Sequence, residues 1–168
     1  MSDTSSMGKW MVLLAWLSAI ALLVMVFGNM LDAQVNPNRQ PQSVSAGGRT
    51  EVTLEQNRAG HYVTSGFINN VPVVFLIDTG ATDVSVPAHL AGPLGLTAGA
   101  SSVVSTANGT IRVARTELDS VRIGDIVVNE VRANINPGMR DDHVLLGMSV
   151  LRQLEFTQRG DSLILRTL

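Results

Sequence analysis

The chain begins with a long apolar run and continues with short stretches in which apolar and polar residues alternate. Residues 10–31 carry no charged side chain, and roughly 20 apolar residues are enough to span a bilayer as a helix. This run predicts a transmembrane anchor, preceded by a short N-terminal tail over residues 1–9. A cleaved signal peptide is the alternative, but its apolar region is shorter, about 7–15 residues, and ends in small residues, which Leu31-Asp32-Ala33 matches poorly.

Residues 32–49 are polar and rich in Pro, Gln, Asn and Ser, a composition typical of a flexible linker. Residues 50–168 are then left as one domain with its own core. Lys9 precedes the apolar run and Asp32 follows it. The positive-inside rule therefore favours a single-pass protein of the inner (cytoplasmic) membrane, with the domain on the periplasmic side. The reverse orientation is the alternative.

The alternation in residues 50–168 is typical of strands joined by turns. Strands are predicted at 51–55, 61–68, 71–77, 102–106, 110–114, 118–123, 126–135 and 162–166. Asn108-Gly109 lies between two of them, and Asn-Gly is a strong hairpin signal. Gly66 inside its strand suggests a bulge. The best helical segment is 148–154, and residues 87–90 fit a single helical turn. The pattern predicts an all-β domain, mostly antiparallel, with one short helix.

Composition narrows the possible functions. The chain has 12 basic and 14 acidic residues and no cysteine, which excludes disulfides, thiolate metal sites and cysteine nucleophiles. Apart from Lys9 the basic residues are scattered arginines, so no nucleic-acid surface is indicated. Serine hydrolysis is disfavoured because no Gly-x-Ser-x-Gly elbow is present.

One acid stands out from the others. Five apolar residues, Val73 to Ile77, lead directly to Asp78, and Thr79-Gly80-Ala81 follows. A carboxylate at the end of a buried strand needs partners or a proton, because an unpaired buried charge is costly. Asp78 alone could still be an Asx-turn residue that caps a strand. The remaining aspartates of the domain lie in polar, turn-like contexts: Asp83, Asp119, Asp125, Asp141, Asp142 and Asp161.

Three segments together resemble the retropepsin-like (clan AA) aspartic proteases, and the N-terminal span resembles their bacterial membrane-anchored, single-lobed branch. The segments are Phe75 to Thr82, the Asn108-Gly109 hairpin, and Val144 to Met148. The resemblance implies an acid-protease barrel with one short helix, preceded by one transmembrane helix. It also implies a membrane-anchored endopeptidase that hydrolyses protein or peptide substrates with water and needs no metal or cofactor.

The resemblance also assigns roles to residues. Asp78 would be catalytic, and because the sequence has a single Asp-Thr-Gly, the second carboxylate would come from another copy in a homodimer. The active-site loop would be supported by Thr79, Gly80 and Ala81. A flap over the substrate would consist of Thr106, Ala107, Asn108, Gly109 and Thr110. The residues packed beneath the site would be Leu145, Leu146 and Gly147.

Alternatives remain for several of these assignments. The same fold could be a non-catalytic, membrane-tethered module that binds peptides or assists assembly. Asn108-Gly109-Thr110 fits a glycosylation acceptor, although a tight turn explains it more simply. Asp141-Asp142-His143 could suggest a metal site, but no ligand spacing supports one and a solvated loop is the simpler interpretation.

Overall fold

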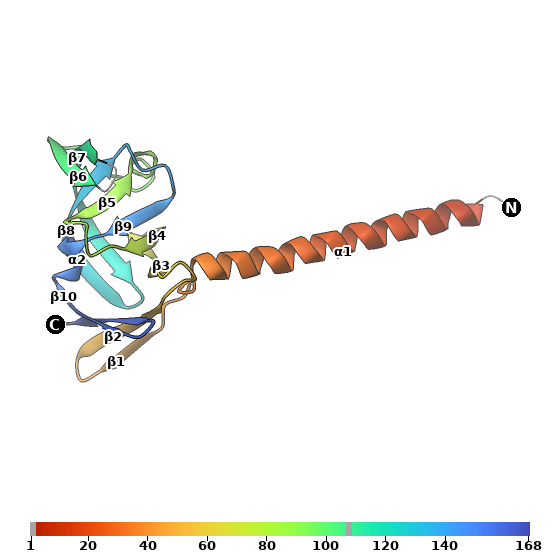
Figure 1. The fold of residues 1–168 in the computed structure, drawn as a ribbon, viewed down its shortest axis with the longest axis horizontal. Coiled ribbons are helices and arrows are strands. Elements are labelled where there is room, and N and C mark those ends of the chain that lie inside the picture. The colour runs from red at the N-terminus through yellow and green to blue at the C-terminus, as the bar shows by residue number, and fades with distance from the viewer. Residues whose placement is uncertain (1–2, 107–108) are drawn as a thin grey trace. The chain divides into compact units, whose positions relative to one another are not determined.

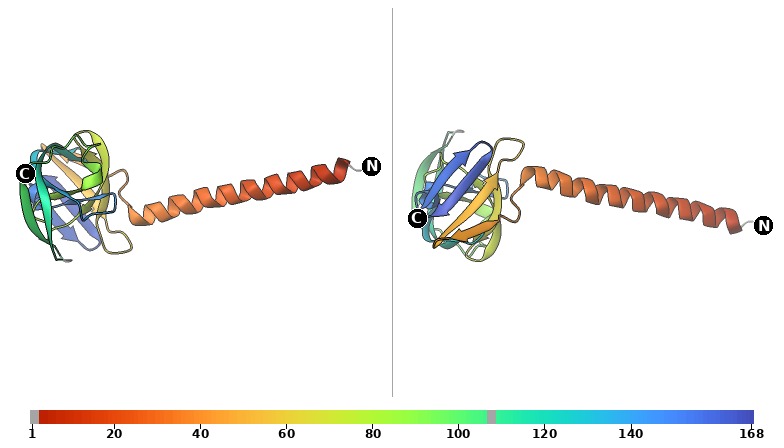
Figure 2. Two further views of the ribbon diagram at one scale, coloured as in Figure 1. Left: turned by 90° about the horizontal axis from the view of Figure 1, so that it is seen from above. Right: turned by 90° about the horizontal axis from the view of Figure 1, so that it is seen from below.

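The computed structural model describes residues 3–106 and 109–168. The chain divides into two units, the helix that ends at Val35 and a β domain from Asn36 to Leu168. Figure 1 shows the elements along the chain, and Figure 2 gives two further views of the same ribbon.

Helix α1 runs from Asp3 to Val35. Its segment Gly8–Val35 contains an 18-residue window with a mean hydropathy of 2.6, and none of that window is buried inside the protein. A helix that is apolar on every side is normally buried in a core or in a membrane. The helix is therefore long and apolar enough to cross a membrane, and the same properties fit a signal sequence.

The β domain contains two sheets. The first has the strand order β1 (Ser43–Ala46), β2 (Arg49–Glu55), β11 (Ser162–Thr167), β10 (Leu154–Arg159). The second has the order β3 (Val63–Ile68), β4 (Val71–Ile77), β9 (His143–Leu146), β5 (Val84–Pro87), β8 (Ile126–Asn136), β7 (Gly109–Ile123), β6 (Ser101–Thr106). In Figure 1 the β6–β7 hairpin and the first sheet lie at opposite ends of the domain.

The second sheet closes on itself. Strand β3 pairs with β4 and also with β7, through Phe67↔Arg122 and Ile68↔Val121. The β6–β7 hairpin extends from this closed part. The result is the predicted all-β barrel with one short helix, α2 (Met148–Leu151), and one 3₁₀ turn, η1 (Ala88–Leu90).

The core lies between the sheets and inside the barrel. Phe75, Val84 and Leu146 are fully buried there, next to the loop that follows β4. Residues from the first sheet belong to the same cluster, including Val52 and Leu165. Burial of this apolar surface is the main force that holds the strand ends in place.

Several local predictions differ from the structure. The sequence does not predict β1, β5, β9 or β10, and it divides β7 into two strands. Pairing is mostly antiparallel, as predicted, but β4–β9 and β5–β8 are parallel. Helix α2 ends at Leu151 rather than at residue 154.

Gly66 does not form the predicted bulge. The β3–β4 register is unbroken from Val63↔Leu76 to Ile68↔Val71. A Cβ at Gly66 would lie 2.7 Å from Cε2 of Phe75 and would also meet the Arg122 carbonyl. The glycine is therefore explained by close packing against the Phe75 ring rather than by an extra residue in the strand.

The segment 32–49, predicted as a flexible linker, carries ordered structure. Helix α1 continues to Val35, and strand β1 pairs with β2. Asn36 and Asn38 are only 7% and 6% exposed. Polar composition misleads here because these asparagine side chains hydrogen-bond to the domain instead of to water.

Asn38 connects this segment to β2 and β3. Its Nδ2 donates to the carbonyls of Glu55 at 2.9 Å and Val63 at 2.7 Å, and its Oδ1 accepts from the Glu55 N–H at 2.8 Å. The Asn38 carbonyl accepts from the Ser65 N–H at 3.0 Å. The segment thus behaves as part of the β domain.

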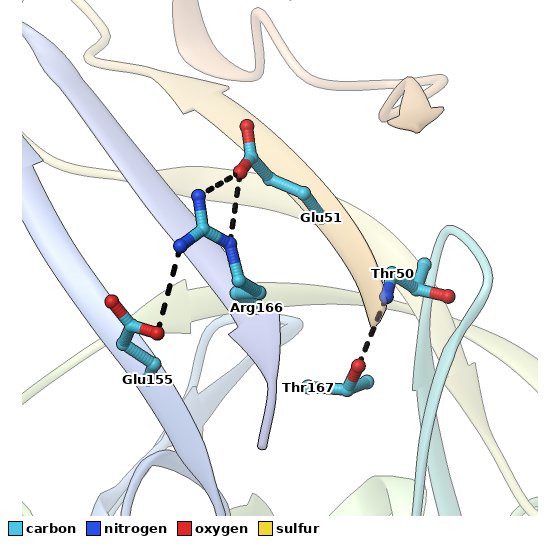
Figure 3. A network of polar contacts seen from close by, with 5 residues as sticks. All are labelled: Thr50, Glu51, Glu155, Arg166 and Thr167. Carbon is cyan, nitrogen blue, oxygen red and sulfur yellow. Dashed lines mark hydrogen bonds and ion pairs between the residues drawn. The ribbon is translucent and has the colours of Figure 1, made fainter. Parts of the chain in front are cut away.

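Polar contacts also tie the terminal strands together on the outer face of the first sheet (Figure 3). Arg166 Nε donates to Glu51 at 3.1 Å, and Arg166 Nη1 lies 3.6 Å from Glu155. The Thr50 N–H donates to Thr167 Oγ1 at 2.9 Å. The hydrogen bond that Arg166 donates to Glu51 is the main cause that raises the pKa of Arg166, and the negative charges of Glu51 and Glu155 add to it.

Candidate active site

Asp78 lies where two parallel strands end at the same edge of the barrel. β4 and β9 pair from Val74↔His143 to Ile77↔Leu146. The Asp78 N–H extends this pairing by donating to the Leu146 carbonyl at 3.1 Å. Asp78 itself is half-buried. A strand fixed by the core therefore delivers a carboxylate to the edge of the sheet.

Backbone hydrogen bonds fix the turn after Asp78. The Ala81 N–H donates to the Asp78 carbonyl at 3.2 Å, and the Gly80 N–H donates to Asp78 Oδ1 at 2.9 Å. A Cβ at Gly80 would lie 3.2 Å from that same oxygen, so the absence of a side chain there eases the approach of the amide. Hydrogen bonds to an ionised carboxylate are stronger than neutral ones, and this one orients Asp78. Thr79 and Gly80 are exposed.

The loop 78–83 rests on the segment that follows β9. The Met148 N–H donates to the Ala81 carbonyl at 2.8 Å. A Cβ at Gly147 would lie 2.7 Å from that carbonyl oxygen and would also meet the Asp83 carbonyl. The structure therefore places Gly147 directly against the loop, with Leu146 buried beside it and Leu145 half-buried.

Ser149 is a supporting residue that sequence reasoning missed. It is 9% exposed, and its Oγ accepts from the Val84 N–H at 3.1 Å. This contact joins the end of the loop to α2. The only sequence signal was a serine in the first turn of the predicted helix, which is too common to stand out.

The predicted flap coincides with the β6–β7 hairpin. The two strands pair from Ser101↔Ala114 to Thr106↔Gly109, and Thr106 Oγ1 donates to the Gly109 carbonyl at 2.8 Å. Gly109 has a φ of 108°, which favours glycine. Thr110 is exposed. Ala107 and Asn108 lie outside the described residues.

The other acids lie elsewhere, with one exception. Asp142 contacts His89, with Oδ1 and Nε2 2.8 Å apart, and Asp141 lies 4.0 Å from His143. Among residues 3–106 and 109–168, no group of three His, Cys, Asp or Glu side chains is placed to hold a metal. The exception is Asp83 at the end of the active-site loop, which lines a cavity of about 270 Å³ together with Arg115 and Arg132. Sequence reasoning did not find this cavity because its walls come from three distant segments.

Known proteins are similar to this chain. A crystal structure of a retropepsin-like aspartic protease from Rickettsia conorii is 30% identical, covers 75% of this chain and is itself 95% covered, with a TM-score of 0.58. The family described as "gag-polyprotein putative aspartyl protease" matches residues 64–153, which include both the Asp78 turn and Gly147. This chain belongs to the retropepsin-like aspartic proteases.

Two curated relatives of this retropepsin-like chain are longer than the region that matches. An uncharacterized protein in the cobV 5′ region of Sinorhizobium sp. is 34% identical over 144 residues, which is 83% of this chain and 62% of the relative. The uncharacterized protein RP867 of Rickettsia prowazekii is 33% identical over 119 residues, 68% of this chain and 51% of the relative. The match thus spans roughly half to three-fifths of the relatives' length.

Proposed function

We propose that this retropepsin-like chain is a membrane-anchored aspartic endopeptidase whose active site forms across a homodimer. The observation that carries the proposal is the placement of Asp78. It lies at the end of a strand that is paired on both sides within the sheet, and the Gly80 amide donates a hydrogen bond to its carboxylate. The Gly80 contact by itself is the hydrogen bond of an Asx turn, and the aspartic protease family of the chain favours a carboxylate that acts on a ligand.

The proposed chemistry needs two carboxylates. Hydrolysis without a covalent intermediate requires a base that activates water and an acid that protonates the carbonyl oxygen. Two close carboxylates can share one proton and perform both tasks, and they then titrate as a pair. The sequence has a single Asp-Thr-Gly, so we assign the second carboxylate to Asp78 of a second copy, related by a two-fold axis.

The remaining roles are those that the resemblance to the retropepsin-like proteases implies. Thr79, exposed on the turn, would hydrogen-bond across the axis and hold the two turns together. Ala81 would leave room for the substrate backbone. The β6–β7 hairpin, residues 106–110 included, would close over the substrate and exclude water. Leu145, Leu146 and Gly147 would support the loop without touching the substrate.

We assign helix α1 to the inner membrane as a single-pass anchor over residues 10–31, with the β domain on the periplasmic side. Its apolar segment supports the anchor, and the position of Lys9 supports the orientation. Fusions of a periplasm-dependent reporter after Leu168 test the topology. Reporter activity would support export, and a reporter that works only in the cytoplasm would reverse the assignment.

The decisive test of catalysis is Asp78→Asn in the full-length protein, assayed on a peptide mixture by mass spectrometry. The variant keeps its size and should lose peptide hydrolysis without unfolding. Asp119→Asn removes an exposed carboxylate from β7 and is the matched control, which should retain activity. Full activity of Asp78→Asn, in a preparation free of other proteases, would sink the catalytic assignment.

A transition-state mimic separates catalysis from the alternative of a non-catalytic peptide-binding module. A hydroxyl-bearing peptide isostere should block cleavage and bind more tightly than the parent peptide. A protein that binds the parent peptide but neither cleaves it nor prefers the isostere would be such a module.

A further inference from the structure

The cavity beside the active-site loop has walls from three parts of the barrel. Asp83 comes from the end of the loop that begins at Asp78, and Ser102 and Val104 come from β6 of the hairpin. Arg115 lies on β7 and Arg132 on β8. Its volume of about 270 Å³ is ample for one side chain.

The two arginines project to the same face of the sheet. Arg115 pairs with Asn134, and Arg132 lies two residues before Asn134 on β8. Residues at such diagonal positions have Cα atoms roughly 7–8 Å apart. Two guanidinium groups on long side chains can therefore converge on one carboxylate between them.

The charges around the cavity are not balanced. Asp83 is its one acid, against two arginines. Glu117 lies opposite Arg132 in the β7–β8 register but does not line the cavity. A ligand that enters therefore meets an excess of positive charge.

Asp83 engages only part of Arg132. Its Oδ1 is buried without a hydrogen bond, and the nearest cation is Arg132 Nε at 3.8 Å, which is beyond hydrogen-bonding distance. The Arg132 side chain remains 71% exposed. Because a guanidinium carries five N–H donors, Arg132 can face Asp83 through Nε and still offer its terminal nitrogens to a ligand.

We propose that this cavity is a specificity subsite that holds the carboxylate of an aspartate or glutamate side chain of the substrate. Arg115 and Arg132 donate the hydrogen bonds, and Asp83 orients Arg132. The proposal rests on the proposed function because it makes the cavity a subsite of the Asp78 site. A basic substrate side chain is disfavoured because it would face two arginines to reach one carboxylate.

Binding to the full-length Asp78→Asn protein in detergent micelles tests the subsite without requiring cleavage. The probes are fluorescent octapeptides of apolar and serine residues in which one Glu, Gln or Lys is moved through every position. At one position at least, Glu should bind about 10-fold more tightly than Gln, as expected for charge-assisted hydrogen bonds. Lys should bind more weakly than Gln.

Arginine variants test whether Arg115 and Arg132 cause the preference for Glu over Gln. In Asp78→Asn combined with Arg115→Gln and Arg132→Gln, the preference for Glu over Gln should fall below about twofold. Arg58→Gln removes an exposed arginine outside the cavity and should keep the preference. If the double variant has a lowered melting temperature, each single variant should reduce the preference by about threefold.

The outcomes separate this proposal from the proposed function. Four outcomes would each overturn the subsite. They are equal binding of Glu and Gln peptides, a preference for Lys, a Glu preference that survives in the double variant, and no binding of any peptide. A Glu preference in a protein whose wild type cleaves none of the peptides would support the subsite and count against catalysis. Cleavage without any acidic preference would support catalysis and refute the subsite.

Discussion

Asn38 offers the sharpest test of how the segment after the helix joins the β domain. Asn38→Ala removes a side chain that donates to two carbonyls, of Glu55 and Val63, and accepts from the Glu55 N–H. All three partners are backbone groups of β2 and β3.

The magnitude follows from those contacts. Each net hydrogen bond contributes about 1 kcal/mol, and a buried backbone group left unpaired costs about 1–3 kcal/mol. Because water can reach the site in part once the side chain is gone, we expect a loss of about 3 kcal/mol in the free energy of unfolding. Domains of this size have a total free energy of unfolding of about 5–15 kcal/mol. A loss of about 3 kcal/mol should lower the melting temperature by roughly 10 °C.

The assay is urea unfolding of a soluble fragment that begins at Asn36, with circular dichroism as the readout. Gln40→Ala is the control, because Gln40 is exposed and the change should stay within about 0.5 kcal/mol. Asn38→Asp should also destabilise the domain, since its carboxylate would face two carbonyls. A change below about 0.5 kcal/mol for Asn38→Ala would refute the view that Asn38 connects the segment to the domain.

Three further predictions concern the loop, the domain boundary and assembly. Gly147→Ala forces a Cβ to 2.7 Å from the Ala81 carbonyl oxygen. The change should lower the free energy of unfolding by about 1–3 kcal/mol and reduce kcat/KM about 100-fold. Near wild-type activity on peptides would contradict this prediction. A fragment that begins at residue 50 lacks β1 and Asn38, so it should unfold at a lower urea concentration than a fragment that begins at Asn36. Equal urea midpoints for the two fragments would contradict this prediction. The specific activity of the longer fragment should fall on dilution as dimers dissociate, and activity independent of concentration in the monomeric range would argue against a shared site.

The sequence predicts the parts of the fold that rest on local signals. Asn69-Asn70 lies between the predicted strands 61–68 and 71–77 and predicts a hairpin turn there; both residues have positive φ in the turn between β3 and β4, as a tight hairpin requires. Strand β4 and the Asp78 turn were expected because five apolar residues precede one acid. These features depend on neighbours in the chain.

The missed elements depend on distant partners. β5 and β9 have four residues each and lie in the interior of the sheet, and a segment of four residues is too short for a periodic pattern to identify it as a strand. β1 is polar and forms the edge of its sheet. The cavity at Asp83 could not be predicted because Arg115 and Arg132 reach it only through the β7–β8 register.

The direct junction between helix α1 and the β domain sets the reach of the proposed enzyme. An extended tether adds about 3.3–3.6 Å per residue, so a flexible segment over residues 32–49 would have let the domain sample tens of ångströms. Instead the helix ends at Val35 and the next residue, Asn36, is already buried in the domain. With α1 as the proposed anchor, no flexible tether of that length would separate the membrane from the domain.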